Sequence, residues 1–106
     1  MDRNAFLDLL EENHKTIVDL NRRKGHDYAG DDDALRNFKS QAADAGVTTE
    51  QVWSIFFGKH LAAIHTYVRE GDVASEPIEG RILDAILYLY LLLGLVKEKR
   101  GLDGVE

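Results

Sequence analysis

Cysteine is absent from the 106 residues of this chain. Its absence excludes a disulfide scaffold and any zinc site built on thiolates, and it fits a reducing compartment. There is only one proline, so few positions must interrupt a helix. The most apolar stretch, residues 82–96, would reach about 22 Å as a helix, which is short of the roughly 30 Å hydrocarbon core of a bilayer. Residues 1–6 lack the basic segment and apolar run of a signal peptide, so we expect a cytoplasmic protein with no membrane partner.

Positive charge is also scarce. The chain has 13 Lys and Arg residues against 19 Asp and Glu residues, which gives a net charge of -6. A protein that coats DNA or RNA needs clustered cations to replace the counterions of the backbone, so this charge argues against a nucleic-acid polymer as partner. A small phosphate compound can still bind through a metal ion or a few placed cations. With 44% hydrophobic and 30% charged residues, we expect one globular domain over residues 1–106.

Hydrophobic residues recur at helical spacing in successive segments, which predicts an all-α fold of four helices. The first helix should run from about Asn4 to Lys24 and end at Gly25, with basic residues in its last turn, where exposed carbonyls favour cations. Residues 25–32 are expected to form a loop, because their side chains favour turns and caps. The apolar stripe of this first helix consists of Phe6, Leu9, Leu10, Ile17 and Leu20.

The second and third helices have start and stop signals in the sequence. One of the aspartates at 31–33 should cap a short second helix, which Gly46 stops. Thr48 and Gln51 form a capping box that opens the third helix. Gly71 is expected to close it.

The fourth helix is expected to begin near Pro77, which has no amide proton to leave unpaired, and to run to about Lys99. It is apolar on nearly every side, so neighbours must cover more than one of its faces. Three other helices, one of them short, offer little surface for this. We therefore predict a homo-oligomer, most simply a dimer, with part of the fourth helix at the interface.

One carboxylate, Asp84, interrupts the apolar sequence of the fourth helix. Burying an ionised carboxylate without partners is costly, so Asp84 predicts a specific partner. Arg81 and Tyr88 lie three and four residues away, and therefore on adjoining turns of the same helix face. Two interpretations stay open. Arg81 and Asp84 form an intrahelical pair, or Asp84 holds a divalent metal or a substrate hydroxyl with Tyr88 as a hydrogen-bonding or stacking wall.

Two further acidic residues, Glu76 and Glu79, stand at the start of the same helix. Acidic residues in a first turn often serve only to complement the helix dipole. With Asp84, however, they would supply the oxygen ligands that Mg²⁺ and Mn²⁺ prefer. The sequence thus offers Glu76, Glu79 and Asp84 as candidate metal ligands.

Lys59 and His60 lie in the middle of the third helix. The lysine either extends its stem over the core with its amine in water or binds a phosphate. His60 has no partner at metal spacing, so zinc is not expected and a structural role is the simpler interpretation.

The segment after the first helix carries Lys24, Asp27 and Tyr28, which belong either to an ordinary helix end or to a loop over a pocket. There they would supply a cation for phosphate, a carboxylate for metal or sugar, and a ring for a base.

Several short motifs of the chain occur together in one known group. They are Lys24-x-x-Asp27-Tyr28-Ala29, Phe38, Lys59-His60, Glu76-Pro77-Ile78-Glu79 and Arg81-Ile82-Leu83-Asp84-Ala85-Ile86-Leu87-Tyr88. In this combination the chain resembles the small phage and bacterial proteins called nucleotide modification associated domain 1. That group is similar to the MazG-like all-α nucleoside triphosphate pyrophosphohydrolases. The resemblance extends roughly from Leu20 to Val96.

The resemblance implies an oligomeric, MazG-like four-helix bundle in which acidic residues hold Mg²⁺ (or Mn²⁺) over the phosphates of a nucleotide. Metal-bound water would attack a phosphate and release pyrophosphate and a nucleoside monophosphate. Carried over to this chain, Asp84 and Glu79 are the expected catalytic residues, and Glu76 joins them as a metal ligand. The expected substrate-binding residues are Lys24, Asp27, Tyr28, Lys59, His60, Arg81 and Tyr88.

Two departures from the MazG-like pattern leave alternatives open. Arg81 stands where a glutamate is usual, three residues before Asp84, and Glu11-Glu12 is followed by Asn13-His14-Lys15 instead of completing a Glu-Glu-x-x-Glu motif. A cation in place of a metal ligand favours direct phosphate binding.

We therefore expect a nucleotide-binding protein of phage nucleotide metabolism, in the host cytoplasm, acting first of all as a Mg-dependent (deoxy)nucleoside triphosphate pyrophosphohydrolase. One alternative is a non-catalytic binder that sequesters a (cyclic) signalling nucleotide to counter host defence. The other is a helical interaction protein whose Asp84 is only salt-bridged.

Overall fold

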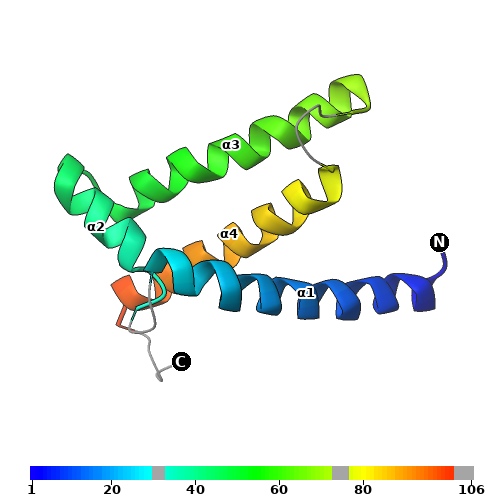
Figure 1. Cartoon of the computed structure of the whole chain (residues 1–106), viewed down its shortest axis with the longest axis horizontal. Helices are drawn as coiled ribbons and strands as arrows, with labels where there is room; N and C mark the ends of the chain where they lie inside the picture. The colour runs from blue at the N-terminus through cyan, green and yellow to red at the C-terminus, as the bar shows by residue number, and fades with distance from the viewer. Residues whose placement is uncertain (30–32, 73–76, 102–106) are drawn as a thin grey trace.

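The computed structural model describes the backbone of residues 1–29, 33–72 and 77–101, and the side chains of these residues except 24–29. Within these ranges all regular structure is helical, as predicted. The helices are α1 (Arg3–Ala29), α2 (Arg36–Ala45), α3 (Thr49–Glu70) and α4 (Ile78–Lys99). Figure 1 shows α3 running beside α4, with α2 at one end of this pair and α1 crossing α4 at an angle. None of the described helices is both long and apolar enough to cross a bilayer.

The end of α1 differs from the prediction. The helix continues through Gly25 to Ala29, so the expected stop at Gly25 and the expected loop over residues 25–29 are wrong. A glycine inside a helix costs only about 1 kcal/mol relative to alanine, which the rest of a long helix can offset. Gly25 therefore permits a helix end without requiring one. Residues 30–32, the remainder of the predicted loop, lie outside the described part of the chain.

The turns that flank α3 follow their predicted signals. Thr48 Oγ1 accepts a hydrogen bond from the backbone N–H of Gln51, and Gln51 Oε1 accepts one from the backbone N–H of Thr48, which completes the capping box. Gly46 ends α2 and Gly71 ends α3, both in the left-handed conformation with φ of 70° and 80°. Glycine reaches this conformation without the steric penalty that a Cβ atom brings.

Gly46, which ends α2, and Gly58, which lies inside α3, allow a paired test of backbone strain. A Cβ atom placed at Gly46, or at Gly58 inside α3, would meet no atom within 4 Å, so packing does not affect either comparison. We expect Gly46→Ala to lower the free energy of unfolding by about 1–2 kcal/mol, because alanine disfavours positive φ. Gly58→Ala should raise it by about 0.5–1 kcal/mol, because alanine is the better helix former. Urea denaturation measures both, and equal shifts in the same direction would contradict this account.

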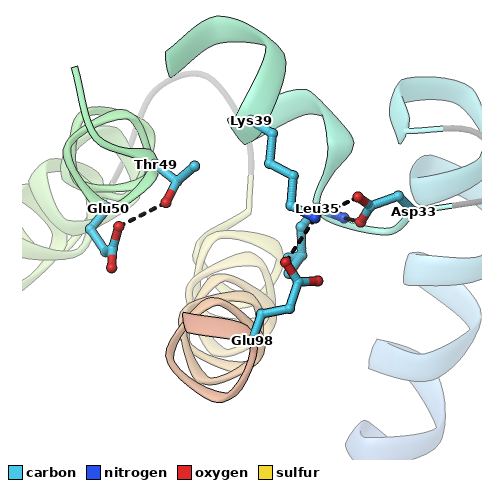
Figure 2. Close-up of polar contacts among 6 residues, drawn as sticks. All are labelled: Asp33, Leu35, Lys39, Thr49, Glu50 and Glu98. Carbon is cyan, nitrogen blue, oxygen red and sulfur yellow. Dashed lines mark hydrogen bonds and ion pairs between the residues drawn. The ribbon is translucent and has the colours of Figure 1, made fainter. Parts of the chain in front are cut away.

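The start of α2 is held by Asp33, the one capping candidate among residues 31–33 that the structure describes. Its Oδ1 accepts a hydrogen bond from the backbone N–H of Leu35 at 2.9 Å, but the N-cap position is Leu35 itself. Asp33 therefore supports the turn before the helix and is not its N-cap residue. Lys39 Nζ lies 2.6 Å from Asp33 Oδ2 and 2.7 Å from Glu98 Oε1, which ties α2 to the end of α4 (Figure 2).

This ion-pair network makes stability depend on pH. The hydrogen bond from Lys39 and that from the Leu35 amide hold the pKa of Asp33 below its ordinary value. A carboxylate with a lowered folded-state pKa stabilises the protein above its unfolded pKa of about 3.9, and this contribution is lost as the pH falls toward the folded-state pKa.

We therefore expect Asp33→Asn to lower the free energy of unfolding at pH 7 by less than about 1 kcal/mol, since the pair is partly exposed. The difference from wild type should shrink as the pH falls from 7 toward 3, because the Asp33 carboxylate then begins to take up a proton. Urea midpoints measured between these two pH values check the prediction, and a difference that grows toward acid would contradict it.

The core lies where α2, α3 and α4 meet. Its buried members come from all three regions and are Leu35, Phe38, Ala42, Val52 and Leu95. Around them pack four partly buried side chains, Trp53, Phe56, Tyr88 and Leu91. Aromatic side chains of α3 and α4 thus border the core along the line where these helices face each other.

By contrast, α1 buries little of its apolar stripe. Ile17 is 6% exposed, whereas Phe6 and Leu10 are 49% and 48% exposed. In the described residues α1 contacts only α4 and α2. The predicted stripe therefore exists, but much of it stays exposed and only Ile17 is buried.

Candidate functional site

Helix α4 presents two different faces, and the predicted residues divide between them. Arg81, Asp84 and Tyr88 lie within about 60° of one another around the helix axis, at 100° per residue. All three side chains are half-buried. Glu79 lies about 140° from Asp84 and about 180° from Tyr88 by the same geometry. The face with Arg81, Asp84 and Tyr88 borders α3, while Glu79 points toward α1, as the contacts of Tyr88 and Glu79 show.

Tyr88 contacts aromatic rings from α2 and α3. Its ring centroid lies 4.8 Å from that of His60 on α3, at an interplanar angle of 42°. It also meets the ring of Phe38 in a T-shaped arrangement, with centroids 6.2 Å apart and an interplanar angle of 76°. The structure thus brings together two predicted substrate-binding residues, His60 and Tyr88, from different helices. We refer to His60, Arg81, Asp84 and Tyr88 as the candidate site.

The single tryptophan of the chain fixes the backbone beneath the candidate site. Trp53 Nε1 donates a hydrogen bond of 2.7 Å to the carbonyl oxygen of Tyr88. Its ring also stacks on Phe57, with centroids 4.7 Å apart and planes within 12°. Sequence reasoning missed this link between α3 and α4. The available signal was a lone tryptophan in an apolar helical pattern, because a covered indole N–H needs a hydrogen-bond acceptor.

Lys59 follows the ordinary behaviour of a lysine beside a core. Its side chain is exposed, and Nζ lies 5.9 Å from the centroid of the Phe56 ring. A cation at this distance from an aromatic ring gains a modest attraction and stays hydrated. Phe56 in turn packs against Phe38 in the core. The ammonium group is therefore available to an anion at the edge of the α3 surface.

Glu79 belongs to a groove of about 330 Å³ between α1 and α4. The polar residues that line this groove are Glu79, Asn13 and His14, and the other lining residues are apolar. Asn13 Nδ2 donates a hydrogen bond of 2.8 Å to the carbonyl oxygen of Leu9 in its own helix. The groove is thus mainly an apolar hollow with a polar edge.

Four predicted site residues cannot be placed. The side chains of Lys24, Asp27 and Tyr28, and all of Glu76, lie outside the described residues. Among the residues that the structure does describe, no group of three carboxylate or histidine side chains could hold a metal ion. The proposed Mg²⁺ ligands Glu76, Glu79 and Asp84 therefore stay a prediction, with Glu79 and Asp84 on different faces of α4.

Comparison with protein-family models, with curated proteins and with solved structures gives no significant match to this chain.

Proposed function

We propose that the chain binds a nucleotide at the candidate site, on the face shared by α3 and α4. The observation that carries this proposal is the contact of the His60 and Tyr88 rings on the face that also carries Arg81 and Asp84. A nucleotide needs three kinds of partner: a ring for its base, a cation for its phosphates and a carboxylate for a sugar hydroxyl or a bound Mg²⁺. The candidate site offers each of them.

Each residue has a role in this proposal. Arg81 binds phosphate oxygens, because its planar guanidinium donates paired hydrogen bonds to them. Tyr88 and His60 stack against the base, with Lys59 as a second cation at the edge of the site. Asp84 accepts a hydrogen bond from a sugar hydroxyl, or it contacts Mg²⁺ that the nucleotide brings with it. Trp53 positions this surface through its hydrogen bond to the Tyr88 carbonyl.

The charges of the chain favour a nucleotide that arrives with its metal. Net charge is -6 at pH 7, so a bare triphosphate would be repelled over distances comparable to the Debye length. A Mg²⁺ ion bound to the phosphates removes two of the negative charges. We therefore expect binding to strengthen when Mg²⁺ is added. Without Mg²⁺, binding should be stronger at moderate salt than at low salt, because salt screens the repulsion.

Hydrolysis is the second candidate. It is favoured by the resemblance around Asp84, and it would make the chain a Mg-dependent pyrophosphohydrolase. Two observations favour binding alone: Arg81 replaces a carboxylate beside Asp84, and Glu79 lies about 140° around α4 from Asp84. Two-carboxylate coordination of one ion from a single helix needs side chains on one face.

The two activities separate in one experiment. The protein is mixed with each nucleoside and deoxynucleoside triphosphate, and with cyclic dinucleotides, in the presence of Mg²⁺. Calorimetry measures binding, and a coupled assay measures released pyrophosphate. We expect at least one nucleotide to give heat of binding and no nucleotide to release pyrophosphate. Catalytic release of pyrophosphate that Asp84→Asn abolishes would establish the hydrolase instead, and no binding of any nucleotide would overturn the proposal.

A further inference from the structure

The groove between α1 and α4 is a concave surface separate from the candidate site. Both helices run toward the end of the molecule that carries α2 (Figure 1). The groove volume of about 330 Å³ lies at the lower end of the range of about 300–1,000 Å³ that is usual for small-molecule sites. Glu79 lines the groove, whereas Arg81, Asp84 and Tyr88 do not. A ligand in this groove would therefore contact a face of α4 that the proposed nucleotide does not use.

A second hollow of about 210 Å³ continues this groove, because the two hollows share His14, Ile17 and Tyr90 as lining residues. We call the two hollows together the α1–α4 groove. Tyr90 follows Glu79 by about three turns of α4, which corresponds to about 16 Å along the helix. The α1–α4 groove is therefore elongated, and its walls are mainly apolar. This shape suits an extended hydrocarbon chain better than a round or branched molecule.

The charge on the α1–α4 groove is negative. Among the residues that line it, only Glu79 carries a full charge at pH 7, and no lysine or arginine lines it. The Glu79 carboxylate makes no hydrogen bond or ion pair with the residues that the structure describes. Asn13 Nδ2 donates to the Leu9 carbonyl oxygen, which leaves Asn13 Oδ1 to accept a hydrogen bond from a ligand. The polar edge of the groove thus offers a negative charge and an acceptor, without a cation.

We propose that the α1–α4 groove binds a small amphiphile with one ammonium group on an unbranched hydrocarbon chain. An ammonium group carries a positive charge and three N–H donors, which complement the Glu79 carboxylate and Asn13 Oδ1. A fatty acid has the same kind of chain, but its carboxylate would be repelled by Glu79 and by the net charge of -6. The proposal does not depend on nucleotide binding, because it concerns a different face of α4.

Burial of hydrocarbon supplies most of the affinity in this proposal. Leu10, Ile82 and Ile86 line the groove and are 48%, 41% and 37% exposed, so a bound chain would cover apolar surface that water now contacts. Each methylene group that becomes buried should strengthen binding by about fourfold. Glu79 is exposed, so water screens its attraction for the head group, which adds at most about fivefold. The chain therefore sets the strength of binding, and the head group sets which amphiphile is preferred.

An amine, an alcohol and an acid of equal chain length test the proposal on the full wild-type chain. n-Octylamine is protonated at pH 7, because the pKa of a primary alkylamine resembles that of lysine. In an NMR titration, n-octylamine should shift the backbone amides of His14 and Ile86 and leave that of His60 in place. It should bind about two- to fivefold tighter than n-octanol, and octanoate should bind weakest of the three. n-Hexylamine should bind about tenfold weaker than n-octylamine, because it buries two fewer methylene groups.

Three results of this titration would overturn the proposal. The first is the absence of n-octylamine binding, which is expected where a second copy of the chain covers the groove. The second is equal affinity for n-octylamine and octanoate, which would remove the charge preference. The third is a shift at His60 in place of those at His14 and Ile86, which would move the amine to the candidate site.

Two substitutions, each with a matched control, test the walls and the charge of the groove separately. Ile86→Trp should weaken n-octylamine binding by about tenfold or more, because the indole displaces at least two methylene groups of the chain. Ile55→Trp, at a side chain that is 66% exposed on α3, should leave the affinity within about twofold of wild type. Equal weakening by the two tryptophans would overturn the proposal.

Glu79→Gln should weaken n-octylamine binding by about three- to fivefold and leave n-octanol binding unchanged, since only the amine carries a charge. Its control is Glu70→Gln, which removes the same charge from an exposed residue at the end of α3 and should change neither affinity. Circular dichroism checks that each variant is folded. Unchanged n-octylamine affinity in Glu79→Gln, or an equal loss in Glu70→Gln, would overturn the assignment of the ammonium group to Glu79.

Discussion

Replacement of Arg81 by glutamine should weaken nucleotide binding by about 10- to 100-fold. Hydrogen bonds to charged groups contribute about 1.5–3 kcal/mol, and a guanidinium on a phosphate makes two of them in parallel. Glutamine keeps much of the length of the side chain but loses the charge and the paired donors. Calorimetric titration with the tightest-binding nucleotide measures the change directly.

A matched control separates this effect from the loss of one positive charge. Arg22→Gln on α1 makes the same change at a side chain that is 76% exposed and far along the chain from the candidate site. Affinity for the nucleotide should then stay within about twofold of wild type. Equal weakening by the two substitutions would point to general electrostatics, and no weakening by Arg81→Gln would remove Arg81 from the phosphate site.

Phe38→Ala should lower the free energy of unfolding by about 3–5 kcal/mol, the usual cost of emptying a buried phenylalanine position. Phe38 is 5% exposed and its ring contacts both Phe56 and Tyr88. Its removal leaves a cavity between α2, α3 and α4, and it withdraws support from the Tyr88 ring. Urea denaturation followed by circular dichroism measures the loss.

The control for this core substitution is Ile55→Ala on α3. Its side chain is 66% exposed, so truncation should cost less than about 1 kcal/mol. All variants need the same protein concentration, because association adds to apparent stability. A loss at Phe38→Ala no larger than that at Ile55→Ala would mean that the core does not lie where α2, α3 and α4 meet.

Local signals in the sequence predicted the helix boundaries well where a specific backbone geometry was required. The Thr48 and Gln51 capping box and the left-handed glycines Gly46 and Gly71 are formed within a few residues, so their sequence signature suffices. Gly25 shows the limit of such signals. Glycine tolerates a helix interior as well as a helix end, and only the surroundings decide between them.

The candidate site was predictable only within one helix. Spacing of three and four residues correctly placed Arg81, Asp84 and Tyr88 on one face, because helical geometry is fixed. The same geometry separates Glu79 from Asp84, although sequence reasoning grouped the two as metal ligands. The contact of His60 with Tyr88 could not be derived, because it depends on the register of α3 against α4. That register is set by packing between residues far apart in the chain.

The most direct measurement of the central claim is a heteronuclear NMR titration of nitrogen-labelled protein with nucleotides and Mg²⁺. The single tryptophan gives one indole N–H signal, and this group donates to the Tyr88 carbonyl beneath the candidate site. A bound nucleotide should shift that signal together with the backbone amides of His60, Arg81 and Tyr88, and leave the amides of the first half of α1 in place. Shifts confined to α1, or no shift with any nucleotide, would contradict a nucleotide site on the face shared by α3 and α4.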